Sequence, residues 1–355
     1  MTPLLGVVTF GAGSGPERFA RGDALARSAE DAGFDSVWVS ELYNRSATIP
    51  MATLATATER VQIGTNIAYG VGRSPLMWAA EARDLDELSS GRIILGLGNG
   101  TKTMMEQWHG VSGEAPAVRM EELVEVLRKL WRLHEGLVQH EGRFYHLNLR
   151  PTADTPPPLR ERLPIYTAGV QPRMIETAGR VADGVVGHPM FTKLYVDEVV
   201  RPAIATGAAK RGRDPSEIAI AGILMCAVND DLELARRRLA FAAAQYAASR
   251  VYDRLFELHG WSAQKAVIAD AVRNRDADAV VATVPDEILD AVGVICRPGE
   301  LAEHVARHGA DYDHLALVTP PWGMTAEEAE AATSVLIDGM RESLAERREK
   351  TPVNG

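Results

Sequence analysis

Glycine and neutral polar residues directly follow several short apolar runs of this sequence. The segments concerned are 40–44, 66–70, 96–101, 168–172, 187–189 and 319–321. None of them groups His, Asp and Glu side chains into a set suited to binding a metal ion. A glycine-rich backbone can approach a ring system closely, so these segments favour a site for a large planar cofactor held by backbone amides.

The segment GLGNG (96–100) partly matches the dinucleotide fingerprint G-x-G-x-x-G. Its glycines stand at 96, 98 and 100, but Thr101 occupies the place of the third required glycine. The segment also follows the fourth apolar run, whereas the fingerprint follows the first strand of its fold. The alternative is that these glycines only ease the exit from a strand into a loop.

Eight short apolar runs precede or contain these segments. They cover residues 4–10, 36–41, 61–69, 92–99, 163–170, 183–188, 218–228 and 314–320. The runs are rich in Val, Ile and Leu and show little alternation between apolar and polar residues. This composition is typical of parallel strands that are buried on both faces.

Amphipathic stretches of helical length separate the runs. Gly33 is expected to end a helix over 17–32, and Ser74-Pro75 is expected to begin one over 75–88. Eight strand–helix repeats predict a (β/α)8 TIM barrel of the α/β class, with an open doubly wound sheet as the alternative. We expect a single domain over residues 1–355. Two insertions are expected, a hairpin at 138–150 after the helix that follows strand 4, and a helical stretch at 249–285 between strands 7 and 8.

Composition and charge narrow the classes of partner. Of the 355 residues, 46% are apolar and 24% are charged, which is typical of a globular protein. The net charge of −10 argues against nucleic acid and against an anionic membrane surface as partners. The longest apolar run, 218–228, is too short to span a bilayer. No targeting segment is visible and there are only two cysteines, so a cytoplasmic location is expected.

Three of the motifs, taken in order, resemble the luciferase-like monooxygenase superfamily and its deazaflavin (coenzyme F-420) dependent oxidoreductases. The motifs are AEDAGFDSVWVSE (29–41), RVQIGTN (60–66) and SGRIILGLGNG (90–100). The resemblance runs from Leu4 to about Leu344. It implies coenzyme F-420, or FMN as the alternative, a small-molecule substrate and a homodimer.

The resemblance also implies a cofactor site. It places a cis peptide bond between Asn66 and Ile67, behind the deazaflavin ring, and a phosphate site at 169–171 where a helix begins. Gly187 and His188 are expected to add a second contact. The cofactor-binding residues so implied are Glu41, Thr65, Asn66, Ile67, Ala68, Gly98, Asn99, Gly100, Ala168, Gly169, Val170, Gln171, Gly187 and His188.

The chain departs from the family pattern at two positions. Several deazaflavin-dependent members carry His where this sequence has Leu42, and sugar-phosphate dehydrogenases carry Glu where it has Thr101. A sugar-phosphate substrate is therefore not expected. Glu41, Tyr43 and Thr101 remain as candidate catalytic residues, whereas His109 is expected to pack and hydrogen-bond locally.

The function implied is hydride transfer between the deazaflavin coenzyme and a small organic substrate. An FMN-dependent two-component monooxygenase of the same superfamily is the first alternative. Because the two proton-transfer groups of the relatives are missing, a non-catalytic flavin-binding barrel is the second alternative.

Overall fold

The computed structural model describes residues 3–9 and 13–350. Within these ranges the chain forms two compact units, which are described one at a time. Unit 1 comprises residues 1–38, 187–200 and 221–355, and unit 2 comprises residues 39–186 and 201–220. The last residue of the first predicted strand, Phe10, lies outside the described residues.

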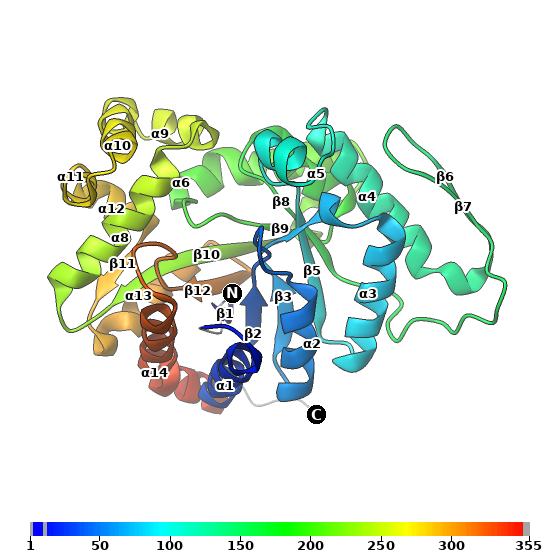
Figure 1. The fold of residues 1–355 in the computed structure, drawn as a ribbon, viewed down its shortest axis with the longest axis horizontal. Coiled ribbons are helices and arrows are strands. Elements are labelled where there is room, and N and C mark those ends of the chain that lie inside the picture. The colour runs from blue at the N-terminus through cyan, green and yellow to red at the C-terminus, as the bar shows by residue number, and fades with distance from the viewer. Residues whose placement is uncertain (1–2, 10–12, 351–355) are drawn as a thin grey trace. The chain divides into compact units, whose positions relative to one another are not determined.

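Unit 1 contains the strands from both ends of the chain. They are β1 (Leu4–Val8), β2 (Ser36–Val39), β10 (Ala219–Val228), β11 (Gly293–Cys296) and β12 (His314–Val318). The last residue of β2 and the first two residues of β10 are counted with unit 2. They pair in the order β11-β10-β12-β1-β2, and the pairings are parallel. Helix α1 (Pro16–Ala32) and helix α14 (Ala326–Lys350) lie side by side although they come from opposite ends of the chain (Figure 1).

The other helices of unit 1 follow β10 and the segment after residue 187. They are α6 (Lys193–Tyr195), α8 (Leu232–Ala247), α9 (Asp253–Leu258), α10 (Ser262–Asn274), α11 (Ala277–Ala282), α12 (Asp286–Val292) and α13 (Leu301–Gly309). The expected helical insertion at 249–285 is confirmed. Strand β11 and helix α13, which follow it, were not expected.

Unit 2 contains β3 (Gln62–Thr65), β4 (Ala68–Tyr69), β5 (Ile93–Gly98), β8 (Ile165–Ala168) and β9 (Gly184–Val186). The order is β3-β5-β8-β9, with β4 also paired to β5. All six residues of β5 are buried, as expected for a strand covered on both faces. The helices are α2 (Thr48–Ala57), α3 (Pro75–Leu88), α4 (Pro116–Trp131), α5 (Pro172–Val181) and α7 (Arg201–Ala209).

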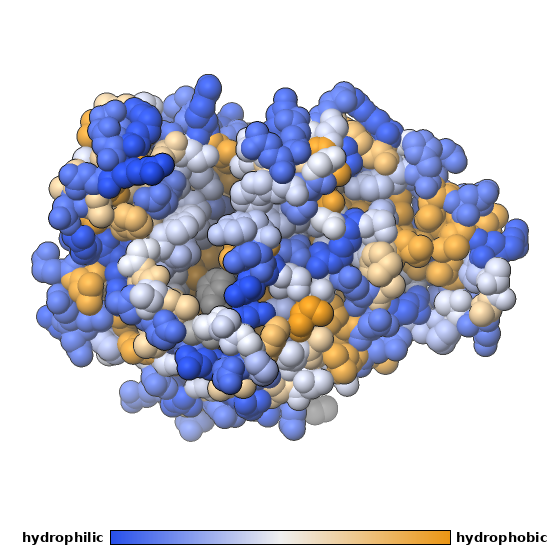
Figure 2. Space-filling model, viewed as in Figure 1, coloured by the Kyte–Doolittle hydropathy of each residue, from blue (hydrophilic) through white to orange (hydrophobic). Residues whose placement is uncertain are grey.

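The predicted hairpin is present in unit 2. Strands β6 (Val138–Glu141) and β7 (His146–Leu149) pair with each other in antiparallel fashion and stand apart from the parallel strands (Figure 1). Near this hairpin, the face drawn in Figure 2 gathers hydrophobic surface. Helix α3 exposes three large apolar side chains, Leu76, Met77 and Leu88.

The strand–helix order is that of a (β/α)8 barrel. Strands β1, β2, β3, β5, β8, β9, β10 and β12 each precede a helix, as predicted. Apart from the additional strands β4 and β11, successive parallel strands within each unit are neighbours, whereas an open doubly wound sheet reverses its order at a switch point. The fold prediction is therefore confirmed. No helix within residues 3–9 and 13–350 has both the length and the apolar composition to cross a bilayer.

Local signals that predicted helix boundaries are visible in the structure. The Ser74 hydroxyl accepts a hydrogen bond from Met77 N–H (3.3 Å), and Pro75 is the first residue of α3. Gly33 ends α1 in the left-handed conformation at φ +110°. Helix α2 was not predicted, because Ala47 before it makes no side-chain capping bond and its composition is almost entirely apolar.

Candidate active site

The chain between β3 and β4 is held against the end of β2. The peptide bond between Asn66 and Ile67 is cis, as the resemblance implied. Asn66 N–H donates to the carbonyl of Val39 (2.9 Å), and Glu41 N–H donates to the carbonyl of Ile67 (2.8 Å). The Ser40 hydroxyl lies 3.0 Å from Asn66 Oδ1 and 3.1 Å from its carbonyl oxygen. Backbone and side-chain bonds thus fix the position of this segment.

The glycines of β5 make room for the same segment. A Cβ atom at Gly96 would lie 1.9 Å from the carbonyl oxygen of Thr65, and one at Gly98 would lie 2.3 Å from Ile67 Cδ1. The buried Thr65 hydroxyl accepts from Gly96 N–H (2.8 Å) and donates to Gly96 C=O (2.7 Å). The GLGNG spacing therefore reflects close packing of neighbouring strands, in addition to an exit turn at Gly100 with φ +69°.

Glu41 is only 8% exposed, and its carboxylate is bound on both oxygens. Oε2 accepts from Tyr69 N–H (2.8 Å) and from Arg73 Nη1 (3.2 Å), and Oε1 lies 2.9 Å from Arg73 Nη2. Ala47 N–H also donates to Glu41 Oε1, at 3.4 Å. The carboxylate thus joins the ends of β2 and β4 to the start of α2.

Arg73 also binds a second carboxylate. Its Nε lies 3.0 Å from Glu81, and its guanidinium lies over the ring of Trp78 at 4.5 Å from the centroid. Burial alone would lower the pKa of Arg73, but the hydrogen bonds and charges of Glu41 and Glu81 raise it. Burial and the charge of Glu41 raise the pKa of Tyr69. Arg73 therefore stays charged and Tyr69 stays neutral.

A cleft of about 970 Å³ opens beside Glu41. We call it the aromatic cleft, and its lining is Glu41, Leu42, Tyr43, Asn44, Arg45, Ser46, Tyr69, Gly72, Arg73, Trp108 and His109. Of the predicted catalytic residues, Glu41 and Tyr43 line it. Thr101 does not, and its hydroxyl instead accepts from Met104 N–H (3.3 Å) at the start of a π-helical turn, Met104–Trp108.

Helix α5 begins directly after β8, where the phosphate site was predicted. Gln171 caps the helix in an extended conformation and Pro172 is its first residue. A Cβ atom at Gly169 would lie 2.4 Å from Met174 Cβ, so this turn fits tightly against the first turn of α5. An N-terminus of this kind favours an anion through its backbone N–H groups and its dipole.

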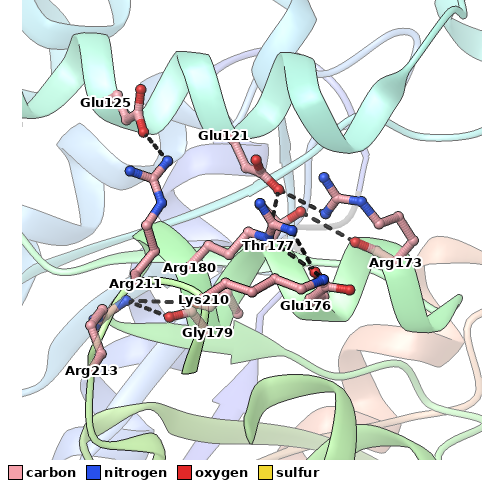
Figure 3. Close-up of polar contacts among 11 residues, drawn as sticks. Glu121, Glu125, Arg173, Glu176, Thr177, Gly179, Arg180, Lys210, Arg211 and Arg213 are labelled. Atoms are coloured by element: carbon pink, nitrogen blue, oxygen red, sulfur yellow. Dashed lines mark hydrogen bonds and ion pairs between the residues drawn. The ribbon is translucent and has the colours of Figure 1, made fainter. Parts of the chain in front are cut away.

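Ion pairs fix α5 between α4 and α7 (Figure 3). Glu121 of α4 binds Arg173 at 2.7 Å and Arg180 at 3.6 Å. Glu176 of α5 binds Arg180 at 2.7 Å and is also bound by Lys210, just after α7. Burial alone would raise the pKa of Glu176, but Lys210 and Arg180 lower it. Both ends of α5 are therefore anchored by charged side chains.

Gly187 and His188 belong to unit 1. Gly187 N–H donates to the carbonyl of Ala221 (2.7 Å). Met190 N–H donates to His188 Nδ1 (3.2 Å), so Nε2 carries the ring proton and donates it to the Tyr252 hydroxyl at 2.7 Å. Burial lowers the pKa of His188 to about 3. His188 is therefore a neutral imidazole, packed edge-on against Tyr246 at a centroid distance of 4.5 Å.

Asn99 and Thr167 are among the residues of unit 2 with a buried polar atom that has no hydrogen-bond partner within the described part of the chain. Asn99, 3% exposed, donates through Nδ2 to the carbonyl of Pro116 (2.7 Å), which leaves its Oδ1 unbound. The hydroxyl of Thr167 in β8 is also buried and unbound. Burying such atoms without a partner costs free energy, so atoms of this kind fit a site completed by a polar ligand.

Sequence comparison identifies the family. A family model described as luciferase-like monooxygenase matches residues 4–314. An uncharacterised protein of Mycobacterium tuberculosis is 34% identical over 293 residues, covering 80% of this chain and 85% of that protein. The 5,10-methylenetetrahydromethanopterin reductase of Methanolobus tindarius is 31% identical over 278 residues, covering 78% and 82%. The chain belongs to the luciferase-like monooxygenase family and to its oxidoreductases.

Solved structures share the fold. The coenzyme F-420 dependent tetrahydromethanopterin reductase of Methanopyrus kandleri superposes with a TM-score of 0.77 at 23% identity, covering 97% of this chain and all of that one. An oxygenating constituent of 3,6-diketocamphane monooxygenase from Pseudomonas putida, in complex with FMN, gives a TM-score of 0.65 at 16% identity, covering 96% and 99%.

Sequence reasoning did not identify three residues of the site. Thr167 lies inside a predicted strand, and nothing in its neighbours distinguishes it from a core residue. Arg73 and Trp108 lie in loops, where their partners come from distant parts of the chain. His109 was expected to hydrogen-bond locally, but its Nε2 is buried and has no partner within the described residues.

Proposed function

We propose that the protein is a deazaflavin (coenzyme F-420) dependent oxidoreductase that transfers hydride to or from a small organic substrate. The pair of unbound polar atoms, Asn99 Oδ1 and Thr167 Oγ1, is the structural observation that supports a bound polar ring system. The name of the Methanopyrus kandleri reductase, a coenzyme F-420 dependent enzyme, supports the deazaflavin over FMN.

The cofactor site is proposed at the strand ends of unit 2. Gly187 and His188, which belong to unit 1, stay a prediction from the resemblance. Ile67 and Ala68 would lie behind the ring, Asn99 would bond to a polar ring atom, and the amides at 169–171 would receive the phosphate. When bound, the coenzyme would supply the carbon that carries the hydride.

The chain's own residues would bind and orient the coenzyme and the substrate, and they would exclude water from the site. We assign Glu41 a positioning role, because its carboxylate is already bound by Arg73 and two backbone amides. Tyr43 is proposed to contact the substrate in the aromatic cleft. Thr101 is proposed to shape the loop above β5 through its bond to Met104. A cytoplasmic location and a homodimer are part of the same proposal.

The decisive experiment is a fluorescence titration of the purified protein with coenzyme F-420 and with FMN. The deazaflavin is expected to bind at least about tenfold more tightly, a difference of about 1.4 kcal/mol. Equal or reversed affinities would refute the proposed cofactor.

An FMN-dependent monooxygenase is the second candidate, supported by the fold shared with the camphane monooxygenase constituent. Oxygen consumption with reduced FMN separates the two, because a deazaflavin activates oxygen poorly. Tight cofactor binding without turnover, on a broad panel of carbonyl and alcohol substrates, would favour a non-catalytic flavin-binding barrel.

A further inference from the structure

The aromatic cleft exposes large ring side chains to solvent. Tyr43 is 77% exposed and Trp108 is 47% exposed, with their rings in edge-to-face contact at 5.7 Å. The neighbouring Leu42 is 47% exposed as well. Large apolar groups that are exposed together mark a binding surface more often than isolated ones do.

The backbone holds these side chains out of the core. Leu42 and Arg45 exchange two backbone hydrogen bonds, at 2.9 and 3.1 Å, which closes a tight turn with Tyr43 at its tip. Trp108 is the last residue of the π-helical turn Met104–Trp108. Turns of this type are rare and occur frequently at functional sites. The exposure of both rings is therefore built into the local fold.

Two of the three charged side chains in the cleft, Glu41 and Arg73, are paired with each other. Arg73 binds Glu41 and Glu81, and Arg45 donates to the carbonyl of Asn44 in its own turn (3.2 Å). Among the buried side-chain polar atoms of this lining, as far as the chain is described, His109 Nε2 has no hydrogen-bond partner. The His109 ring lies beside Tyr69, with centroids 4.9 Å apart. The cleft thus offers ring surfaces with hydrogen-bonding side chains beside them, among which are His109 and Arg45.

From these observations we infer that the aromatic cleft is the substrate subsite and that it takes an aromatic carbonyl compound. The substrate ring would pack on Tyr43 and Trp108, where aromatic pairs prefer edge or offset contact. The carbonyl oxygen would accept a hydrogen bond from His109. This inference rests on the proposed function and narrows its substrate class.

The reaction balances with the reduced deazaflavin as the reductant. The carbonyl carbon gains a hydride, its C=O π bond breaks, and the oxygen takes a proton from water. The products are the alcohol and the oxidised deazaflavin.

A matched pair of substrates tests the ring requirement. With the reduced coenzyme, benzaldehyde is expected to give a kcat/KM at least about tenfold higher than cyclohexanecarbaldehyde, which has a similar size but no aromatic ring. Trp108→Ala is expected to remove most of this preference. Leu88→Ala, a change at an equally exposed side chain of α3 outside the cleft, is expected to leave it intact.

A binding experiment without the coenzyme separates this inference from the proposed function. Calorimetry is expected to show that benzamide binds more tightly than cyclohexanecarboxamide, and that His109→Phe weakens benzamide several-fold. If benzamide binds in this way but the coenzyme does not, the subsite stands and the proposed function fails. Equal binding of the two amides, or displacement of bound coenzyme by benzamide, would overturn the subsite.

Discussion

Glu41 and Arg73 form the most extensively bonded charged pair at the candidate active site. Each is mostly buried, and together they join β2, β4 and the segment before α3. Removing one partner of a buried ion pair leaves the other charge without compensation, which costs several kcal/mol. The pair therefore contributes to the shape of the site through its effect on the strand ends.

Glu41→Gln is expected to lower the free energy of unfolding by more than about 1 kcal/mol and to weaken cofactor binding, because Arg73 loses the more buried of its two counter-charges and keeps only Glu81. Denaturant unfolding and cofactor titration measure the two effects. Glu81→Gln is the control, since that carboxylate is more exposed and its loss should cost less than about 1 kcal/mol. A hundredfold fall in kcat with unchanged affinity and stability would instead make Glu41 the acid–base group.

His188 is expected to make the protein less stable in acid. Its pKa is about 3 in the folded chain, against an ordinary value of 6.5, so the unfolded chain binds a proton that the folded chain does not. Stability is full above pH 6.5 and falls by up to about 1.4 kcal/mol per pH unit as the pH drops from 6.5 toward 3.

His188→Asn tests this dependence, because its side-chain oxygen can still accept the Met190 N–H bond. Thermal unfolding between pH 7 and pH 4 should show a shallower loss of stability in this variant. His146→Asn, a change at an exposed histidine of the hairpin, should keep the wild-type slope. Identical slopes in all three proteins would exclude His188 as the source.

At the scale of elements, the turn between β8 and α5 allows no added side chain. Gly169→Ala is expected to press on Met174 and on the backbone at Ile175, tilting the first turn of α5 away from the proposed phosphate position. Cofactor affinity should fall by about tenfold, a change of about 1.4 kcal/mol.

A glycine in open space provides the comparison for this variant. A Cβ atom added at Gly299 would have no other atom within 4 Å. The Gly299→Ala protein should therefore bind the cofactor as the wild type does. Unchanged affinity in the Gly169→Ala protein, with a native far-UV spectrum, would move the phosphate site elsewhere.

The elements could be predicted where local signals were strong. Apolar runs rich in Val, Ile and Leu located all eight barrel strands, and Ser74-Pro75 and Gly33 located helix ends. Helix α2 has no such start signal, and β11 lies after the predicted helical stretch 249–285, where no element was predicted. At the site, the backbone near Asn66 and Ile67 was predictable from the resemblance. The partners of Arg73 and His109 were not, because their contacts depend on loops that sequence periodicity does not describe.

At the scale of the whole molecule, the proposed homodimer is open to direct measurement. Sedimentation equilibrium at micromolar concentration is expected to give twice the chain mass of 38.5 kDa. Exposed apolar side chains on α3, and the hydrophobic surface near the hairpin in Figure 2, are consistent with a protein that buries further surface on association. A single species of 38.5 kDa would contradict the dimer.

The close packing of Ile67 on Gly98 has a consequence for the evolution of this sequence. A larger side chain at position 98 would need space that Ile67 occupies, because a Cβ atom at Gly98 would lie 2.3 Å from Ile67 Cδ1. The two positions should therefore covary among relatives, with alanine or serine at 98 accompanied by a residue smaller than isoleucine at 67. A motif search that takes Gly96, Gly98 and Gly100 for a nucleotide-binding motif would attribute to a ligand what is close packing between Gly98 and Ile67. An alignment of relatives in which the sizes at 67 and 98 vary independently would show that the backbone shifts to absorb the change.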